Sequence, residues 1–295
     1  IRRLEVKHLI TPFLISAIIL CQEIVPGYWN SLSTHVTVGV PLLDDETLIK
    51  GRIQLKVSFN DGKSFDNLGD ETLIEKGDID DLKLVSVPAD IFENMIGFQE
   101  GVNAKFIAQV WDRAGNSITG SVSDSMIIVD QLLPELITLE ITSSNELEPT
   151  MAMPGDSITF QINTNESINK PILKINEEIY EGAVGIDKSW MYVYPSDDAD
   201  DGVIDFEISY TDIAGNPGVS LTKATDGKTI IRDSTEPELE EVVLFTSNPY
   251  DSSLAIEGDT VFLTFNSSEQ IRDIKILLNS SEAILKNKES LSFIY

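Results

Sequence analysis

A shift of 103 residues superimposes two long segments of this chain without a gap. It places Pro134-Glu135-Leu136 on Pro237-Glu238-Leu239 and Gly155-Asp156 on Gly258-Asp259, and the same register holds through further turn residues. A repeat of this length corresponds to a whole domain, because the units of solenoids and propellers span about 20–50 residues. The chain is therefore expected to contain consecutive domains of about 100 residues each.

A short motif, Asp-x-Ala-Gly-Asn, occurs at 112–116 and again at 212–216. An alternating run of apolar residues precedes each copy, and another strand-like run follows it. Gly and Asn tolerate a positive φ, so the motif predicts the tight loop of a β-hairpin. Because the motif also occurs in the first part of the chain, we interpret that part as a further domain of the same kind. An insert around Asp61–Asp81 has no counterpart in the repeat.

The hydrophobic pattern predicts an all-β chain of tandem sandwiches. Apolar residues alternate with polar ones in many short runs, of which 158–162 and 261–265 are related by the repeat. No segment after residue 30 shows a long helical period, and short strands with turns between them are typical of β-sandwiches. We expect domains at 28–131, 132–234 and 235–295. The third is expected to be incomplete and prone to aggregation, because counterparts of the strands around the second motif are missing.

These features together resemble the tandem bacterial immunoglobulin-like repeats of large surface proteins and adhesins. The resemblance rests on the Asp-x-Ala-Gly-Asn motif, on Asp-x-x-x-Pro linkers at 130–134 and 233–237, and on the Gly-Asp pair that opens the second strand. It covers Thr34 to Tyr295. It implies a stalk or an adhesive module with an unidentified protein or glycan ligand, whose neighbours are further Ig-like repeats of the same chain.

The charge balance excludes some partners. Asp and Glu total 49 against 21 Lys and Arg, which gives a net charge of −28. Such a surface repels nucleic acid phosphates and anionic lipid headgroups, so no nucleic acid partner is expected. The apolar content of 42% allows real cores, and a single cysteine excludes an intrachain disulfide.

The inventory of reactive residues predicts no catalysis. The two histidines, His8 and His35, lie near the N-terminus, so a nucleophile paired with a histidine base cannot form later in the chain. Motifs of serine hydrolases, zinc proteases, P-loops and dinucleotide sites do not occur. Paired carboxylates could hydrolyse glycosides, but 49 acidic residues bring some pairs together by chance.

Acidic residues instead suggest calcium, which takes six to eight oxygen ligands. In an Ig-type sandwich, the loop between the second and third strands lies at the same end as the loop between the sixth and seventh. These two loops and the incoming linker would bring together the oxygens of Asp130, Glu135, Glu166, Asp212 and Asn216.

Two further sets are candidate calcium ligands. The next junction would use Asp233, Glu238 and Glu269, and the densest acidic run holds Asp197, Asp198, Asp200 and Asp201. The alternative for the two junction sets is that the residues cap turns and keep the joints soluble, and for the acidic run that it is a solvated loop before the strand that starts at Phe206.

The N-terminus has the pattern of a targeting segment. Arg2, Arg3 and Lys7 precede an apolar run from Leu9 to Cys21, too short for a transmembrane helix of about 20 apolar residues. We interpret 1–27 as a signal peptide or N-terminal anchor, through which alone the chain would attach to a membrane. Cys21 lies where bacterial lipoproteins carry their lipidated cysteine, although Leu20 replaces the small residue expected before it. A buried strand or helix is the alternative.

The sequence thus predicts a secreted or cell-surface protein, or an outer-membrane lipoprotein if Cys21 is modified. Its repeats would form a non-catalytic stalk or adhesive module with junctions stiffened by calcium. Two other hypotheses stay open: an accessory Ig-like region of a large secreted enzyme, and a carbohydrate-binding module.

Overall fold

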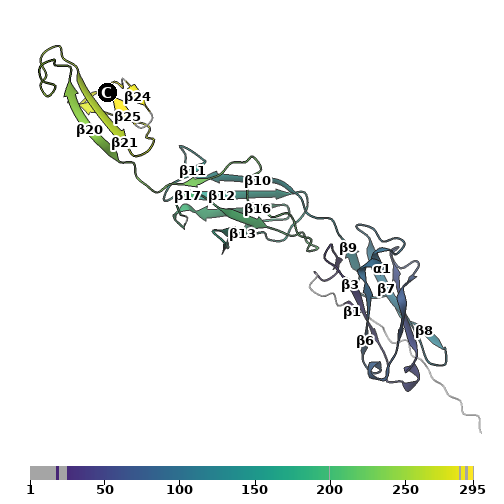
Figure 1. Ribbon diagram of the computed structural model, residues 1–295. Helices are drawn as coiled ribbons and strands as arrows, with labels where there is room; N and C mark the ends of the chain where they lie inside the picture. The colour runs from purple at the N-terminus through teal and green to yellow at the C-terminus, as the bar shows by residue number, and fades with distance from the viewer. Residues whose placement is uncertain (1–17, 20–24, 199, 286, 290–291, 295) are drawn as a thin grey trace, which may run out of the picture. The chain divides into compact units, whose positions relative to one another are not determined.

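The computed structural model describes residues 18–19, 25–198, 200–285, 287–289 and 292–294 (Figure 1). Strands dominate it; the helical elements are α1 (Ala89–Glu93) and three single 3-10 turns at Glu46–Leu48, Lys76–Asp78 and Ser196–Asp198. The all-β class predicted from the alternating pattern is confirmed. No helix in the described ranges is long and apolar enough to cross a membrane. The predicted targeting segment lies mostly outside these ranges, as does Cys21.

The chain divides into two compact units, Ile1–Arg232 and Asp233–Tyr295. The first unit holds two separate hydrophobic cores, here called the first and second core, and the second unit holds a third.

Two sheets enclose the first core. One has the strand order β1-β3-β6, with β1 (Ile18–Ile19), β3 (His35–Pro41) and β6 (Leu82–Pro88). The other has the order β2-β9-β7-β4-β5, with β2 (Tyr28–Trp29), β9 (Ile127–Val129), β7 (Asn103–Trp111), β4 (Arg52–Ser58) and β5 (Asp66–Leu73), and β8 (Ser117–Thr119) beside β7. The pairing is antiparallel except between β2 and β9, which are parallel. The insert predicted from the repeat supplies β5.

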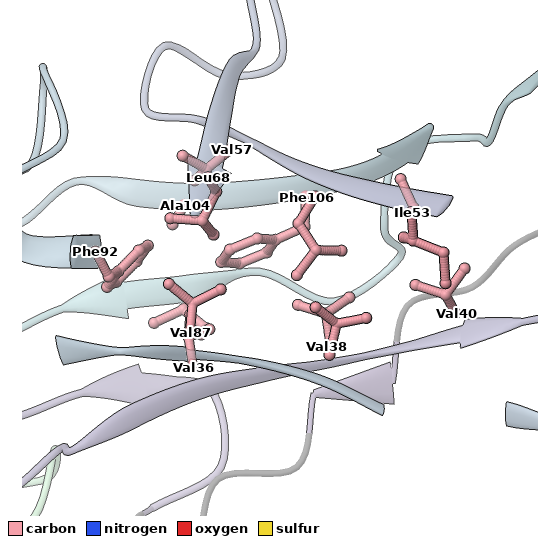
Figure 2. Close-up of a cluster of buried hydrophobic side chains, with 14 of the residues drawn as sticks. Val36, Val38, Val40, Ile53, Val57, Leu68, Val87, Phe92, Ala104 and Phe106 are labelled. Carbon is pink, nitrogen blue, oxygen red and sulfur yellow. The ribbon is translucent and has the colours of Figure 1, made fainter. Parts of the chain in front are cut away.

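Alternating side chains of these strands meet in the first core. Figure 2 shows Val36, Val38 and Val40 of β3 facing Ile53 of β4 and Phe106 of β7, and all five are buried. Fully burying one such side chain contributes about 1.5–3 kcal/mol. Because every second residue of these strands faces the core, several such contributions add up between the two sheets. The sequence pattern therefore explains this core directly.

The second core lies among three groups of strands. The largest has the order β10-β12-β16-β15, with β10 (Leu136–Ser143), β12 (Ser157–Thr164), β16 (Ser189–Pro195) and β15 (Val184–Ile186) (Figure 1). Another has the order β14-β13-β18, with β14 (Glu178–Tyr180), β13 (Ile172–Ile175) and β18 (Phe206–Ser209). In the last, β11 (Met151–Ala152) is parallel to β19 (Ile231–Arg232), which also pairs with β17 (Gly202–Val203).

Strands of the third core follow the 103-residue spacing. Its sheet has the order β20-β21-β25-β24, with β20 (Leu239–Thr246), β21 (Val261–Ser267), β25 (Ser292–Ile294) and β24 (Asn287–Glu289). β20 begins and ends 103 residues after β10, and β24 does so after β15. β22 (Leu277–Leu278) and β23 (Ser281–Glu282) form a separate two-stranded hairpin, whereas β13 and β14 pair within a three-stranded sheet that includes β18.

Equivalent apolar residues differ in exposure between the second and third cores. Leu139 and Ile141 of β10 are 0% and 5% exposed, whereas Val242 and Leu244, at the same positions of β20, are 57% and 58% exposed. Within the described part of 233–294, Phe265 is the one buried hydrophobic residue. The pattern is repeated, but the third core covers far less of its apolar surface.

This difference predicts unequal costs for two matched substitutions. Leu139→Ala leaves a cavity and is expected to cost about 2–5 kcal/mol of the free energy of unfolding. Val242→Ala is expected to change it by about 0.5 kcal/mol or less, because exposed positions away from special features are tolerant. Urea unfolding of the full chain, followed by hydrogen exchange over 136–143 and 239–246, measures both. Equal losses would contradict the exposed placement of Val242.

Candidate metal centre

The second Asp-x-Ala-Gly-Asn turn builds the candidate site. Asp212 accepts two hydrogen bonds from Asn216, at Oδ1 from the backbone N–H and at Oδ2 from Nδ2, both at 2.8 Å. The first copy makes the same bonds, from Asn116 to Asp112, also at 2.8 Å. Each turn has its glycine at a φ of 90°. The hydrogen bond from the asparagine side chain is the main reason that the pKa of Asp112 lies below its ordinary value.

Burial separates the two copies. Asp212 is 1% exposed and Asn216 is 0% exposed, whereas Asn116 of the first copy is exposed. The second turn is covered by the segment around Asn30 and by the linker at Asp130, to which Asn216 Nδ2 donates a hydrogen bond at the backbone oxygen (2.9 Å). A carboxylate that is near the surface in one copy is thus withdrawn from solvent in the other.

Three carboxylates converge at this buried turn. Asp130 directly follows β9, Glu166 lies in the loop after β12, and Asp212 lies after β18. One carboxylate oxygen from each lies within 4.8 Å of the other two. No other group of three or more acidic, histidine or cysteine residues meets this spacing in the described ranges.

The electrostatics of the cluster disfavour three free negative charges. Burial, followed by the charges of Asp212, Glu100 and Glu166, raises the pKa of Asp130 from 3.8 to about 6. Burial and Asp212 also raise the pKa of Glu166. Lys188 opposes the shift at Glu166, although its Nζ donates to the backbone oxygen of Asn165 at 2.8 Å. A proton or a cation would relieve this repulsion.

The donor set suits a hard divalent cation. Carboxylate oxygens are the ligands that calcium prefers, and the cluster contains neither histidine nor cysteine. Asn216, predicted as a ligand, is committed to the protein instead: its Oδ1 accepts from the Ser31 N–H at 2.7 Å, and its Nδ2 donates twice. It orients Asp212 rather than offering a free oxygen.

Glu135, the fifth predicted ligand, is not part of the cluster. Its side chain is exposed. Its backbone N–H and oxygen both pair with Asn165, at 2.9 Å each, which joins the linker to the loop that carries Glu166. Glu238 makes the corresponding pair with Ser268, 103 residues later.

The candidate ligands Asp233, Glu238 and Glu269 form no comparable cluster among the described residues of the second unit. Asp233 accepts a hydrogen bond from the Thr235 N–H at 3.0 Å, as a turn-capping residue does. Glu269 Oε1 is buried without a hydrogen-bond partner.

The acidic run at 197–201 is used locally where the structure describes it. Asp197 accepts from the Gly155 N–H at 2.9 Å, and Asp201 forms an ion pair with Arg232. Asp200 is exposed, and the side chain of Asp198 lies outside the described residues. Turn capping and ion pairing thus account for the two partnered carboxylates of this run.

Sequence analysis missed three contributors to the site: Glu100, Asn30 and Ser31. Glu100 raises the pKa of Asp130 and Glu166, and its carboxylate accepts from the Gln131 N–H at 2.9 Å. None of the three lies in the 103-residue repeat or the shared motif, so no sequence signal singled them out.

The raised pKa of Asp130 predicts a pH dependence of stability without divalent cations. The folded state holds this proton more tightly than the unfolded state, whose pKa is near 3.8. The contribution of the protonated Asp130 carboxyl to the free energy of unfolding is therefore fully present below pH 3.8 and is lost as the pH rises through about 6. Asp130→Asn should therefore reduce the loss of stability between pH 3.8 and about 6. In the presence of a chelator, the variant should be more stable than the native chain at about pH 7.

Urea unfolding in a chelator at several pH values between about 4 and 8 tests this expectation. Asp226→Asn is a matched control, because Lys228 lowers the pKa of Asp226 and the sign of the effect reverses. A pH profile of Asp130→Asn identical to that of the native chain would contradict the prediction.

Comparisons with known proteins add no family. No protein-family model matches the chain, and a search of curated proteins finds no match. Among solved structures, the crystal structure of dimeric latent PorU from Porphyromonas gingivalis is similar at 14% sequence identity and a TM-score of 0.25. The match covers 85% of this chain and 26% of that one, so this chain spans about a quarter of its length. A TM-score this low supports no argument about function.

Proposed function

We propose that this chain is a non-catalytic repeat region of a bacterial surface protein, in which a calcium ion stiffens the connection between two Ig-like domains. The observation that carries the proposal is the convergence of Asp130, Glu166 and Asp212. One of these carboxylates comes from the linker and the other two come from loops of the second core. An ion bound to all three would restrain the linker against that core.

The strand order supports Ig-like sandwiches. In the second core, β10, β12, β16 and β15 lie in the order of strands A, B, E and D of a constant-type immunoglobulin sheet. β13 and β18 pair as strands C and F do, and β19 pairs with β17, the short strand that precedes β18. In the first core, β3 pairs with β6 as strand B pairs with E, while β9, β7 and β4 follow the order of G, F and C.

Calcium is the favoured cation because of charge and ligand type. Three carboxylates, with Glu100 nearby and Lys188 as the opposing cation, leave a local excess of negative charge. Calcium accepts irregular sets of carboxylate, carbonyl and water oxygens, whereas magnesium demands near-ideal octahedral geometry. Backbone oxygens and water would complete the coordination.

A structural rather than catalytic role fits the remaining chemistry. The chain has two histidines, neither after residue 35, and its acidic surface suits a solvated spacer. The basic and apolar residues of the first 27 positions support export to the cell surface. The region would then hold a binding tip away from the cell, or bind a protein or glycan ligand itself.

Calcium titration of the full chain tests the proposal. After chelation, added calcium should raise the thermal midpoint, with a gain of about 2.7 kcal/mol when the ion exceeds its Kd about a hundredfold. Small-angle scattering should show, over the same titration, a narrower distribution of the maximum dimension of the chain. Extracellular calcium modules bind with a Kd of about 0.1–1 mM, so the titration should reach about 10 mM.

Asp130→Asn combined with Asp212→Asn should abolish the response, because ligand charge sets calcium affinity. Asp112→Asn, in the exposed copy of the same turn, is the control and should leave it intact. No change in midpoint or dimensions up to about 10 mM calcium, or an unchanged response in the double variant, would refute the proposal.

A further inference from the structure

We infer that the Asp212–Asn216 turn is a docking element that fastens the second core to the Asn30–Ser31 segment and the linker, and that it does so without a cation. This inference does not depend on the proposed calcium site. It assigns a second task to a motif that sequence analysis interpreted as a simple hairpin turn.

Three hydrogen bonds connect the turn to residues outside its own core. Asn30 Nδ2 donates to the backbone oxygen of Ala214 at 2.8 Å, and the Ser31 N–H donates to Asn216 Oδ1 at 2.7 Å. Asn216 Nδ2 donates to the backbone oxygen of Asp130 at 2.9 Å. These bonds span 184, 185 and 86 residues of sequence, so they are tertiary contacts rather than local turn bonds.

The asparagines of the contact are buried, whereas Ser31 at its edge is exposed. Asn30 is 2% exposed, while Ala214 and Asn216 are 0% exposed. The remaining acceptor of the Asn30 side chain, Oδ1, is used by the Leu32 N–H and by Ser33 Oγ. Removing either partner would leave buried polar groups unsatisfied, which costs more than the bond itself contributes.

The first copy of the motif shows that the turn does not need this contact for its own shape. Asn116 makes the same two bonds to Asp112 that Asn216 makes to Asp212, at the same distances. Residues 113–116 are nevertheless exposed. The turn is therefore a preformed surface, and docking in the second copy adds a tertiary role to it.

The two glycines give the same contrast. Gly115 and Gly215 both have a φ of 90°, so alanine is strained equally at either position. A Cβ on Gly115 would meet nothing within 4 Å, whereas one on Gly215 would lie 3.1 Å from Asn30 Nδ2 and 3.1 Å from Val25 Cγ2. Close approach to the docked segment is thus a requirement of the second glycine alone.

The docking element differs chemically from the carboxylate cluster beside it. Its acceptors are two backbone oxygens and one amide oxygen, and its donors are amide and backbone N–H groups. No carboxylate takes part in the three bonds across the contact. The attachment should therefore persist in a chelator, where the proposed calcium restraint is absent.

Matched variants of the full chain, studied in a chelator, test the inference. Gly215→Ala is compared with Gly115→Ala, and Asn216→Ala with Asn116→Ala. Each control removes the same bonds within the turn, or adds the same methyl group, at the exposed copy. One readout is hydrogen exchange of the Ser31 amide, which should become about tenfold faster in Asn216→Ala and in Gly215→Ala, because its bond to Asn216 is lost or weakened.

The second readout is the distance distribution between spin labels at Ser86→Cys and Glu140→Cys, with Cys21 replaced by serine. The two label sites belong to the first and second cores, and the distribution should broaden in Gly215→Ala and Asn216→Ala but not in the controls. Unchanged exchange and unchanged width in both variants would overturn the inference. So would equal changes in the Gly115 and Asn116 controls, which would reveal general destabilisation. Absence of calcium binding would refute the proposed function and leave this result unaffected.

Discussion

The contacts between the first and second cores depend on one turn, in which a carboxylate accepts two hydrogen bonds from the asparagine four residues later. In the second copy, the bonds from Asn216 to Asp212 hold the turn so that the Ala214 oxygen and Asn216 Oδ1 are available to Asn30 and Ser31. The same bonds place the Asp212 carboxylate beside Asp130 and Glu166. One local turn therefore defines both a neutral contact and an acidic cluster.

These two features oppose each other energetically when no cation is bound. The neutral contact buries polar groups that are all paired, whereas the cluster gathers like charges and raises the pKa of Asp130 to about 6. The bonds of the contact hold the linker beside the cluster, since Asn216 donates a hydrogen bond to the backbone of Asp130, whose side chain is in the cluster. A cation would convert the repulsion into a restraint, so the two interactions would then act together.

The sequence predicted the features that follow from the repeat and from sandwich topology, but not the individual partners of single side chains. Alternation was sufficient for the all-β class, and the 103-residue spacing marks the limits of β10 and β20 to the residue. Topology placed Asp130, Glu166 and Asp212 together because loops at one end of a sandwich meet. Glu135 and Asp201, both predicted as calcium ligands, pair instead with Asn165 and Arg232. These partners are 30 and 31 residues away in the sequence. Composition does not reveal such pairings.

The exposed copy at 112–116 shows why a motif alone does not determine a role. Its hydrogen bonds match those of the buried copy, so selection for turn geometry would explain both sequences equally well. The difference arises from a segment far away in sequence, since Asn30 contacts Ala214 across 184 residues. Without a side chain on Gly215, the backbone of the turn can lie against that segment, with Asn30 Nδ2 3.1 Å from where a Cβ would stand. Gly115 is thus required only for the positive φ of its turn, whereas Gly215 is required both for the positive φ and for close packing against the docked segment.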